Sequence, residues 1–241
     1  MPRTARAAVG GIVYHVHNRG NGRMGVFREP GDYCAFIQLL LDGKTKAHIE
    51  LFGFCIMPNH WHLVLRPKGD RDLAAYLSWV TNTHVKRYRA HYRRTSGHLY
   101  QGRYKSFPVA DDVYFRTLVR YVEANPLKAK LVDRAQDWEW SSLGCAPALR
   151  AKLLDPWPVD RPRNWLALVN QPMSETDSRR VRNSLARSRP FGSDSWTKEM
   201  AERLGLQYTL RPRGRPKRPA PRETATAVPY RDIRLTRRAR H

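Results

Sequence analysis

The chain has 241 residues and a mass of 28.0 kDa, and its 44 Lys and Arg against 21 Asp and Glu give a formal net charge of +23. This excess attracts polyanions through counterion release and indicates a nucleic-acid partner. No apolar run approaches the roughly 18 residues of a membrane span, and the glycine-broken N-terminal stretch does not resemble a signal peptide. Because the 3 cysteines are dispersed, neither a disulfide framework nor a cysteine-built zinc site is expected. We expect a cytoplasmic, nucleoid-associated protein.

Hydrophobic periodicity predicts an alternation of strands and helices in the first half of the chain. The turn residues of 18–22 and Pro58-Asn59 separate neighbouring elements. The order βαββαβ, with one helix added, matches an α+β fold of the ferredoxin-like, split-βαβ type, which has an antiparallel sheet and helices on one face. The predicted strands are 12–17, 48–57, 60–66 and 105–110, and the predicted helices are 32–41, 72–91 and 111–124.

The composition changes beyond about residue 135, where tryptophans lie among prolines and only two short helices are predicted, 174–188 and 195–204. Residues 211–241 contain 11 basic and 2 acidic residues with few apolar ones, so a disordered basic tail is expected. We therefore predict three regions: an α+β domain over 1–135, a helical extension over 136–210 and the tail over 211–241.

His60 and His62 are the first candidate for a chemical site. Positions i and i+2 of a strand share a face, so both imidazoles look away from Trp61, which points toward the helices. Two imidazoles on the open face of a sheet form half of a metal site. The alternative is that the pair is structural, which this spacing alone permits.

A second pair with the same spacing, His15 and His17, lies on the first predicted strand. The first and third strands of a split-βαβ sheet are central neighbours, so the two pairs can converge. A histidine-rich zinc site is therefore an open alternative.

Tyr121 and Asn125 are four residues apart, which places both side chains on one face of the last predicted helix. The amide oxygen suits a hard divalent ion, and a tyrosine activated by a metal can act as a nucleophile. The structural alternative is that Tyr121 packs in the core and Asn125 ends the helix before Pro126. Tyr114 is a rival nucleophile, although it lies too far along the helix to share a metal with Asn125.

These residues fall in four ordered segments that together resemble the HUH-type single-tyrosine transposases, most closely the bacterial REP-associated tyrosine transposases. The resemblance covers about residues 8–145 and implies the HUH endonuclease fold. The segments are Tyr14-His15-Val16, Arg19-Gly20-Asn21, Met57-Pro58-Asn59-His60-Trp61-His62-Leu63 and Tyr121-Val122-Glu123-Ala124-Asn125-Pro126-Leu127-Lys128-Ala129.

The resemblance also implies a mechanism and a substrate. His60, His62 and Asn125 would hold Mg²⁺ or Mn²⁺, and Tyr121 would attack a single-stranded DNA to leave a 5′-phosphotyrosine and a free 3′-hydroxyl. The implied substrates are strands that carry imperfect palindromic (REP-like) hairpins, and no nucleotide cofactor is required. His17 matches no catalytic position of the family, so His15 is grouped with it as structural or DNA-facing.

Several basic residues are candidates for binding the nucleic acid. Arg103 lies in an aromatic and basic segment, 98–104, of the kind that single-strand binding favours. The Gly-Arg-Pro core near Arg213 and Arg215 resembles an AT-hook, whose arginines lie in a narrow A·T-rich minor groove; a generic basic tail is the alternative. The remaining candidates are Arg19, within the second segment above, and Lys86, Arg87, Arg93 and Arg94, at the end of the long helix.

Two further functions remain open on the sequence alone. One is a catalytically silent, transposase-derived DNA-binding or regulatory protein. The other is an RNA-binding module, which would place aromatic side chains where this sheet carries histidines. Both a monomer and a homodimer are compatible with the sequence.

Overall fold

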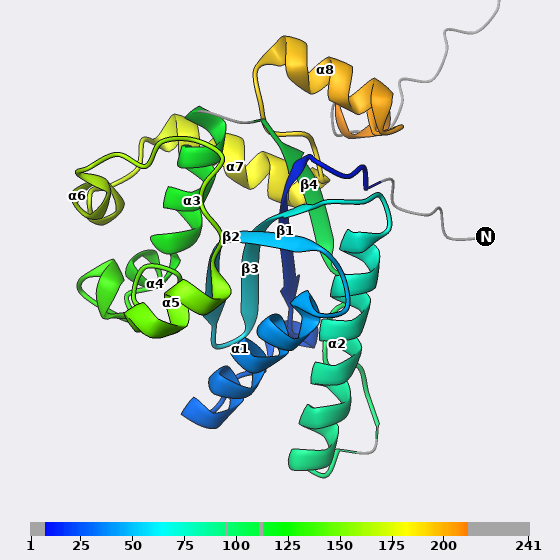
Figure 1. Cartoon of the computed structure of the whole chain (residues 1–241), viewed down its shortest axis with the longest axis vertical. Coiled ribbons are helices and arrows are strands. Elements are labelled where there is room, and N and C mark those ends of the chain that lie inside the picture. Colours follow the sequence, from blue (N-terminus) through cyan, green and yellow to red (C-terminus); the bar gives the residue numbers. More distant parts are fainter. Residues whose placement is uncertain (1–7, 95, 111–112, 212–241) are drawn as a thin grey trace, which may run out of the picture. The chain divides into compact units, whose positions relative to one another are not determined.

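The computed structural model describes residues 8–94, 96–110 and 113–211 (Figure 1). By its internal contacts the chain divides into two compact units, Met1–Leu210 and Arg211–His241, and the account below concerns the first. The boundary expected after residue 135 stays a prediction. The AT-hook-like segment with Arg213 and Arg215 lies outside the described residues.

The sheet consists of β1 (Val13–Arg19), β2 (Ile49–Met57), β3 (His60–Pro67) and β4 (Lys105–Val109). Its order is β2-β3-β1-β4, and every neighbouring pair is antiparallel. This order confirms the split-βαβ sheet that was predicted, with the first and third strands at the centre. In the register of that central pair, His17 lies opposite His62 and Arg19 opposite His60.

One face of the sheet is covered by α1 (Pro30–Lys44) and α2 (Asp72–His91). Trp61, Leu63 and Leu65 point to this side and join the apolar side chains of both helices in one core. The helices approach closely at Gly43, where an added Cβ would lie 2.6 Å from the Tyr76 ring. A larger residue there would push α1 from α2.

The opposite face carries a second helical layer, built from α3 (Val113–Glu123), α6 (Trp165–Asn170) and α7 (Glu175–Arg187) (Figure 1). Helices on one face were expected from the split-βαβ pattern, and α1 and α2 fit that pattern. The added helix α3 lies on the other face because its apolar stripe, which includes Phe115 and Val119, packs on the sheet. The histidine face is therefore partly covered rather than fully open.

The segment after α3 covers both edges of the sheet. Beside β2, the backbone N–H of Ile56 donates to Trp140 O at 2.9 Å, and Trp138 Nε1 donates to Ile56 O at 2.9 Å. Beside β4, Ala110 N donates to Phe191 O and Phe191 N donates to Pro108 O, both at 2.9 Å. Unpaired edge strands can associate with strands of other chains. The extension completes the sheet by forming hydrogen bonds along both edges.

The helices of the first half start and end close to their predicted positions, and so do α7 and α8 (Asp194–Arg203). The helix expected to end before Asn125 instead continues into a short turn, α4 (Asn125–Lys128), because Pro126 fits the first turn of a helix. Asn125 thus opens a new helix instead of closing the old one. α5 (Pro147–Leu153) and α6 were not predicted, since each has fewer than eight residues.

Candidate active site

The predicted site residues His60, His62, Tyr121 and Asn125 line one groove of about 710 Å³. Its walls come from β1, β3, α3, α4, α7 and the segment before β4, so elements far apart in the sequence meet there. The other lining residues are His17, Asn18, Arg19, Met57, Gln101, Gly102, Arg103, Lys105, Lys128, Ala129, Arg182, Leu185 and Ala186.

His60 is oriented by the turn that precedes β3. Asn59 Nδ2 donates to Arg23 O at 3.1 Å, which fixes the amide so that Asn59 Oδ1 faces His60 Nδ1 at 2.6 Å. An amide oxygen only accepts hydrogen bonds, so His60 Nδ1 carries the proton. Its Nε2 is left with a lone pair.

His62 lies deeper and is only 3% exposed. Its Nδ1 is 2.9 Å from Nε2 of His15, so the hydrogen bond again uses Nδ1 and leaves Nε2 without one. Burial lowers the pKa of His60 to about 4, with Arg19 adding to the effect, and it lowers the pKa of His62 well below its usual range. Both rings are therefore neutral at pH 7, the form that binds a metal.

His15 and His17 converge on the same histidines, as the sheet order predicts. The ring of His62 lies 5.0 Å from that of His15 and 5.7 Å from that of His17, measured between centroids. However, His15 and His62 form a hydrogen bond with each other. Within the part of the chain that the structure describes, these histidines are not gathered around one point as in a metal cluster, which disfavours the zinc alternative.

Tyr121 and Asn125 lie on the other wall. Asn125 Nδ2 donates to the backbone oxygens of Tyr121 at 2.9 Å and of Val122 at 3.3 Å. These bonds fix the amide and leave Oδ1 as its available acceptor. The Tyr121 ring is 6.4 Å from that of His62, and burial raises the pKa of its phenol. The rival Tyr114 does not line this groove and instead accepts a hydrogen bond from Arg180 at 3.2 Å.

The donor set of this groove fits a divalent cation. In each of His60, His62 and Asn125 a hydrogen bond occupies one polar atom and leaves the other available, and the remaining atoms are two imidazole nitrogens and one amide oxygen. Neutral imidazoles and an amide oxygen suit metals with mixed nitrogen and oxygen coordination. All three side chains line the same groove.

Of the cations predicted to bind nucleic acid, Arg19 and Arg103 line the groove. The segment that carries Arg103 is held beside β1, because Gln101 N donates to Arg19 O at 3.0 Å. Sequence reasoning did not select Lys105, Lys128 and Arg182, which also line the groove. Lys128 lies in the motif that begins at Tyr121, so the sequence could have indicated it. No motif near Arg182 in the sequence indicated that this residue belongs to the site.

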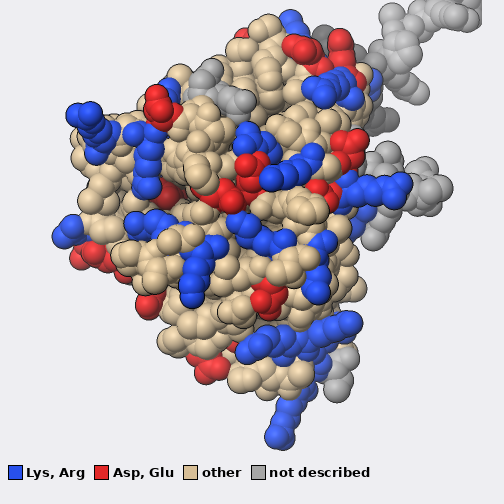
Figure 2. All heavy atoms as spheres, in the orientation of Figure 1, with Lys and Arg blue, Asp and Glu red and all other residues tan. Residues whose placement is uncertain are grey.

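The other predicted cations, Lys86, Arg87, Arg93 and Arg94, lie on or just after the C-terminal end of α2, and all are exposed. The structure does not bring them into the groove. Lys and Arg side chains are also widespread on the face shown in Figure 2, with Asp and Glu fewer between them. The positive charge is therefore spread over the surface and is not confined to the site.

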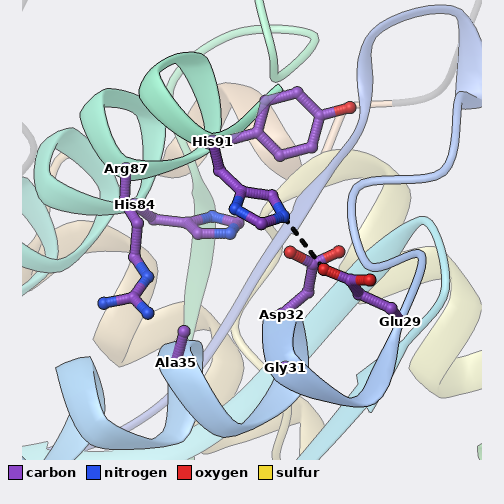
Figure 3. A pocket seen from close by; sticks show the side chains of 8 residues that line it. Glu29, Gly31, Asp32, Ala35, His84, Arg87 and His91 are labelled. Carbon is purple, nitrogen blue, oxygen red and sulfur yellow. Dashed lines mark hydrogen bonds and ion pairs between the residues drawn. The ribbon is translucent and has the colours of Figure 1, made fainter. Parts of the chain in front are cut away.

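A separate cluster of Glu29, Asp32 and His91 lies where α1 begins and α2 ends (Figure 3). The hydrogen bonds of these side chains explain why they lie together, without a bound ligand. His91 Nε2 pairs with Glu29 Oε1 at 2.9 Å, and Asp32 Oδ2 accepts from the Arg28 backbone N–H and from the Tyr92 hydroxyl. The negative charge of Asp32, in the first turn, thus stabilises the start of α1.

None of the described helices combines the length and the apolar character that crossing a membrane requires.

Comparison with known proteins finds transposases that are similar to this chain. Residues 8–125 match the family described as "Transposase IS200 like". A curated Haemophilus influenzae protein, named as a REP-associated tyrosine transposase, is 23% identical over a match that covers 44% of this chain and 77% of the relative. A solved structure of a REP-associated tyrosine transposase bound to a REP hairpin is 19% identical, with a TM-score of 0.50, and the match covers 67% of this chain and 95% of that one. Through residues 8–125, the chain is similar to the IS200-like transposases.

Proposed function

We propose that the protein cleaves and rejoins single-stranded DNA at hairpin sequences, with Tyr121 as the nucleophile and a divalent cation in the groove. The observation that carries this proposal is the meeting of His60, His62, Asn125 and Tyr121 in one groove. Similarity of residues 8–125 to the IS200-like transposases supports the reaction class. The hairpin bound by the similar solved protein supports the substrate.

In this proposal His60, His62 and Asn125 would hold Mg²⁺ or Mn²⁺. The bound cation supplies polarisation of the scissile phosphate and stabilises negative charge on its oxygens. The chain prepares its ligands in advance, since burial keeps both imidazoles neutral and hydrogen bonds hold all three side chains.

Tyr121 performs the covalent step. Its hydroxyl oxygen forms a bond to phosphorus while the bond from phosphorus to the 3′ oxygen breaks. Because burial raises the pKa of the phenol, Tyr121 enters the step protonated and its proton passes to solvent, while the departing 3′ oxygen gains a proton. The product is a 5′-phosphotyrosine and a free 3′-hydroxyl, and attack by another 3′-hydroxyl reverses the step and rejoins the DNA.

The cations of the groove bind the strand on both sides of Tyr121. Arg19, Arg103 and Lys105 lie toward the end of β1 and the start of β4. Lys128 Nζ lies over the Tyr121 ring at 4.2 Å from its centroid, and Arg182 reaches the groove from α7. Such cations bind phosphates and place the scissile bond against the hydroxyl.

The experiment uses single-stranded hairpin oligonucleotides from repeats that flank the gene, incubated with Mg²⁺ or Mn²⁺ and, in parallel, with EDTA. We expect a protein–DNA adduct on a denaturing gel in the presence of metal and none with EDTA. Tyr121→Phe should abolish the adduct because it lacks the attacking oxygen, whereas hairpin affinity should stay nearly unchanged.

Tyr114→Phe is the matched control, since Tyr114 lies on the same helix outside the groove, and it should form the adduct. A fully active Tyr121→Phe protein would contradict the choice of nucleophile. Tight hairpin binding without an adduct in either metal would instead favour a catalytically silent DNA-binding protein.

A further inference from the structure

We propose that His15 is a positioning residue for the metal site: it accepts the Nδ1–H of His62 and so holds His62 in the tautomer with an unprotonated Nε2. The inference rests on the proposed function in so far as that function assigns His62 to the metal. It gives a role to a buried histidine that has no contact with substrate.

The two rings form a close, enclosed pair. His15 Nε2 and His62 Nδ1 are 2.9 Å apart, and the residues are 1% and 3% exposed. They come from β1 and β3, the two central strands of the sheet, whose antiparallel ladder runs from Tyr14 opposite Leu65 to Arg19 opposite His60. The pairing of these strands therefore fixes where one ring meets the other.

The hydrogen bond between them has one donor and one acceptor. Of two imidazole nitrogens 2.9 Å apart, one carries the N–H and the other accepts it. If His15 donated, His62 would carry its proton on Nε2 and could not bind a metal there. Only the arrangement in which His62 donates leaves its Nε2 lone pair available.

His15 acts through His62 because it does not reach the groove. Among the described residues that line the groove, β1 contributes His17, Asn18 and Arg19 but not His15. The His15 ring also lies beside Phe107 of β4, at 4.9 Å between centroids, and beside His17, at 6.0 Å. Partners that hold a metal-binding histidine by its second nitrogen typically change metal affinity about 10–100-fold when removed.

The first test needs neither metal nor DNA. Nitrogen-15 NMR of the imidazoles in the full-length protein distinguishes the two neutral tautomers, and the His62 signals are assigned by their loss in His62→Gln. We expect the wild-type His62 ring to be protonated at Nδ1. In His15→Phe, which keeps an aromatic ring against Phe107 but removes the acceptor, we expect a mixture of tautomers.

The second test is a calorimetric titration with Mn²⁺ alone. His15→Phe should weaken Mn²⁺ binding about 10–100-fold, and His15→Gln should restore part of it, because an amide oxygen can accept the same N–H. His48→Phe is the matched control: His48 is exposed and precedes β2, so it should bind Mn²⁺ as the wild type does.

A wild-type His62 protonated at Nε2 would overturn the inference, as would a folded His15→Phe protein with unchanged tautomer and unchanged Mn²⁺ affinity. If His15→Phe does not fold, the wild-type tautomer and His15→Gln still decide the question. If the wild type does not bind Mn²⁺, the metal site of the proposed function is refuted. The tautomer measurement tests the His15–His62 hydrogen bond independently of that result.

Discussion

Burial leaves both the imidazoles and the phenol of the groove uncharged, with opposite consequences for reactivity. It lowers the pKa of His60 to about 4 and raises that of Tyr121. Neutral imidazoles are ready to bind a metal, whereas a neutral phenol is a poor nucleophile. The proposed metal ligands are therefore prepared by the fold alone, and Tyr121, as the proposed nucleophile, depends on groups that arrive with the substrate or line the groove beside it, such as Lys128.

Glu123, two residues after Tyr121, is a buried acid with a structural role. It is 1% exposed and accepts hydrogen bonds from Ser142 Oγ at 2.6 Å and Trp165 Nε1 at 2.7 Å. It thereby links α3 to the extension. Burial raises its pKa above the usual value despite these bonds, so the folded state favours the protonated acid.

The raised pKa predicts how Glu123→Gln changes the pH dependence of stability. The unfolded chain releases this proton at about pH 4.3, earlier than the folded chain does, so wild-type stability falls as pH rises from there through the folded pKa. Glutamine imitates the protonated acid, because its amide can donate to Ser142 Oγ and its oxygen can accept from Trp165. We expect Glu123→Gln to gain stability relative to the wild type as pH rises from 4 to 8.

Urea unfolding at several pH values measures this difference. Glu123→Ala provides the contrast: it leaves the Trp165 N–H and the Ser142 hydroxyl without this partner, and it should lose about 2 kcal/mol or more. A constant difference between Glu123→Gln and the wild type from pH 4 to pH 8 would show that Glu123 does not titrate with folding.

At the scale of elements, the sequence was most informative where periodicity is long and least where segments are short. The turn Pro58-Asn59 between the two strands of the β2–β3 hairpin and the repeated apolar positions of α2 predict both elements to within a residue. α5 and α6 offer too few turns for a period to show. The face of the sheet that carries the histidines could be predicted from strand alternation and sheet order. That α3 covers this face could not be predicted, because it depends on packing between residues far apart in the sequence.

The same limit explains why the contribution of α7 to the groove could not be predicted. α7 follows the last motif residue by tens of positions, and it is placed by Val181, which is fully buried in the core of the second face. This packing brings Arg182, Leu185 and Ala186 to the groove. The extension therefore forms part of the candidate active site, as well as covering the sheet edges.

Arg182→Gln tests this role of α7. If Arg182 binds one phosphate of the hairpin strand, removing its charge should lower affinity and reduce the slope of log affinity against log salt by about 0.7–0.9. Arg179→Gln makes the same charge change on an exposed position of α7 that does not line the groove, so it should change the slope less. Fluorescence anisotropy over a salt series measures both. Equal slopes of log affinity against log salt in the two variants would show that Arg182 does not bind a phosphate of the strand.

At the scale of the whole molecule, part of the positive charge lies in a segment of the sequence apart from the groove residues. The groove residues lie between residues 17 and 186, whereas residues 211–241 hold a net +9 of the total +23. Diffuse positive charge strengthens binding to any DNA, whereas in the proposed function the groove cations bind the strand where it reacts. Removing residues 211–241 should therefore lower the general affinity for DNA without abolishing the proposed cleavage reaction.

A chain of residues 1–210 makes this separation measurable, because that part forms a compact unit by its own contacts. We expect its thermal midpoint and its metal-dependent adduct at low salt to match those of the full chain, while its DNA affinity falls and the salt slope decreases by several units.

Duplexes rich in A·T or in G·C then distinguish the two origins of the lost affinity. A loss mainly on A·T-rich duplexes would identify minor-groove binding by Arg213 and Arg215, whereas equal losses would indicate generic phosphate attraction. An adduct that vanishes although the shortened chain remains folded would contradict the separation and would make the last segment part of the catalytic machinery.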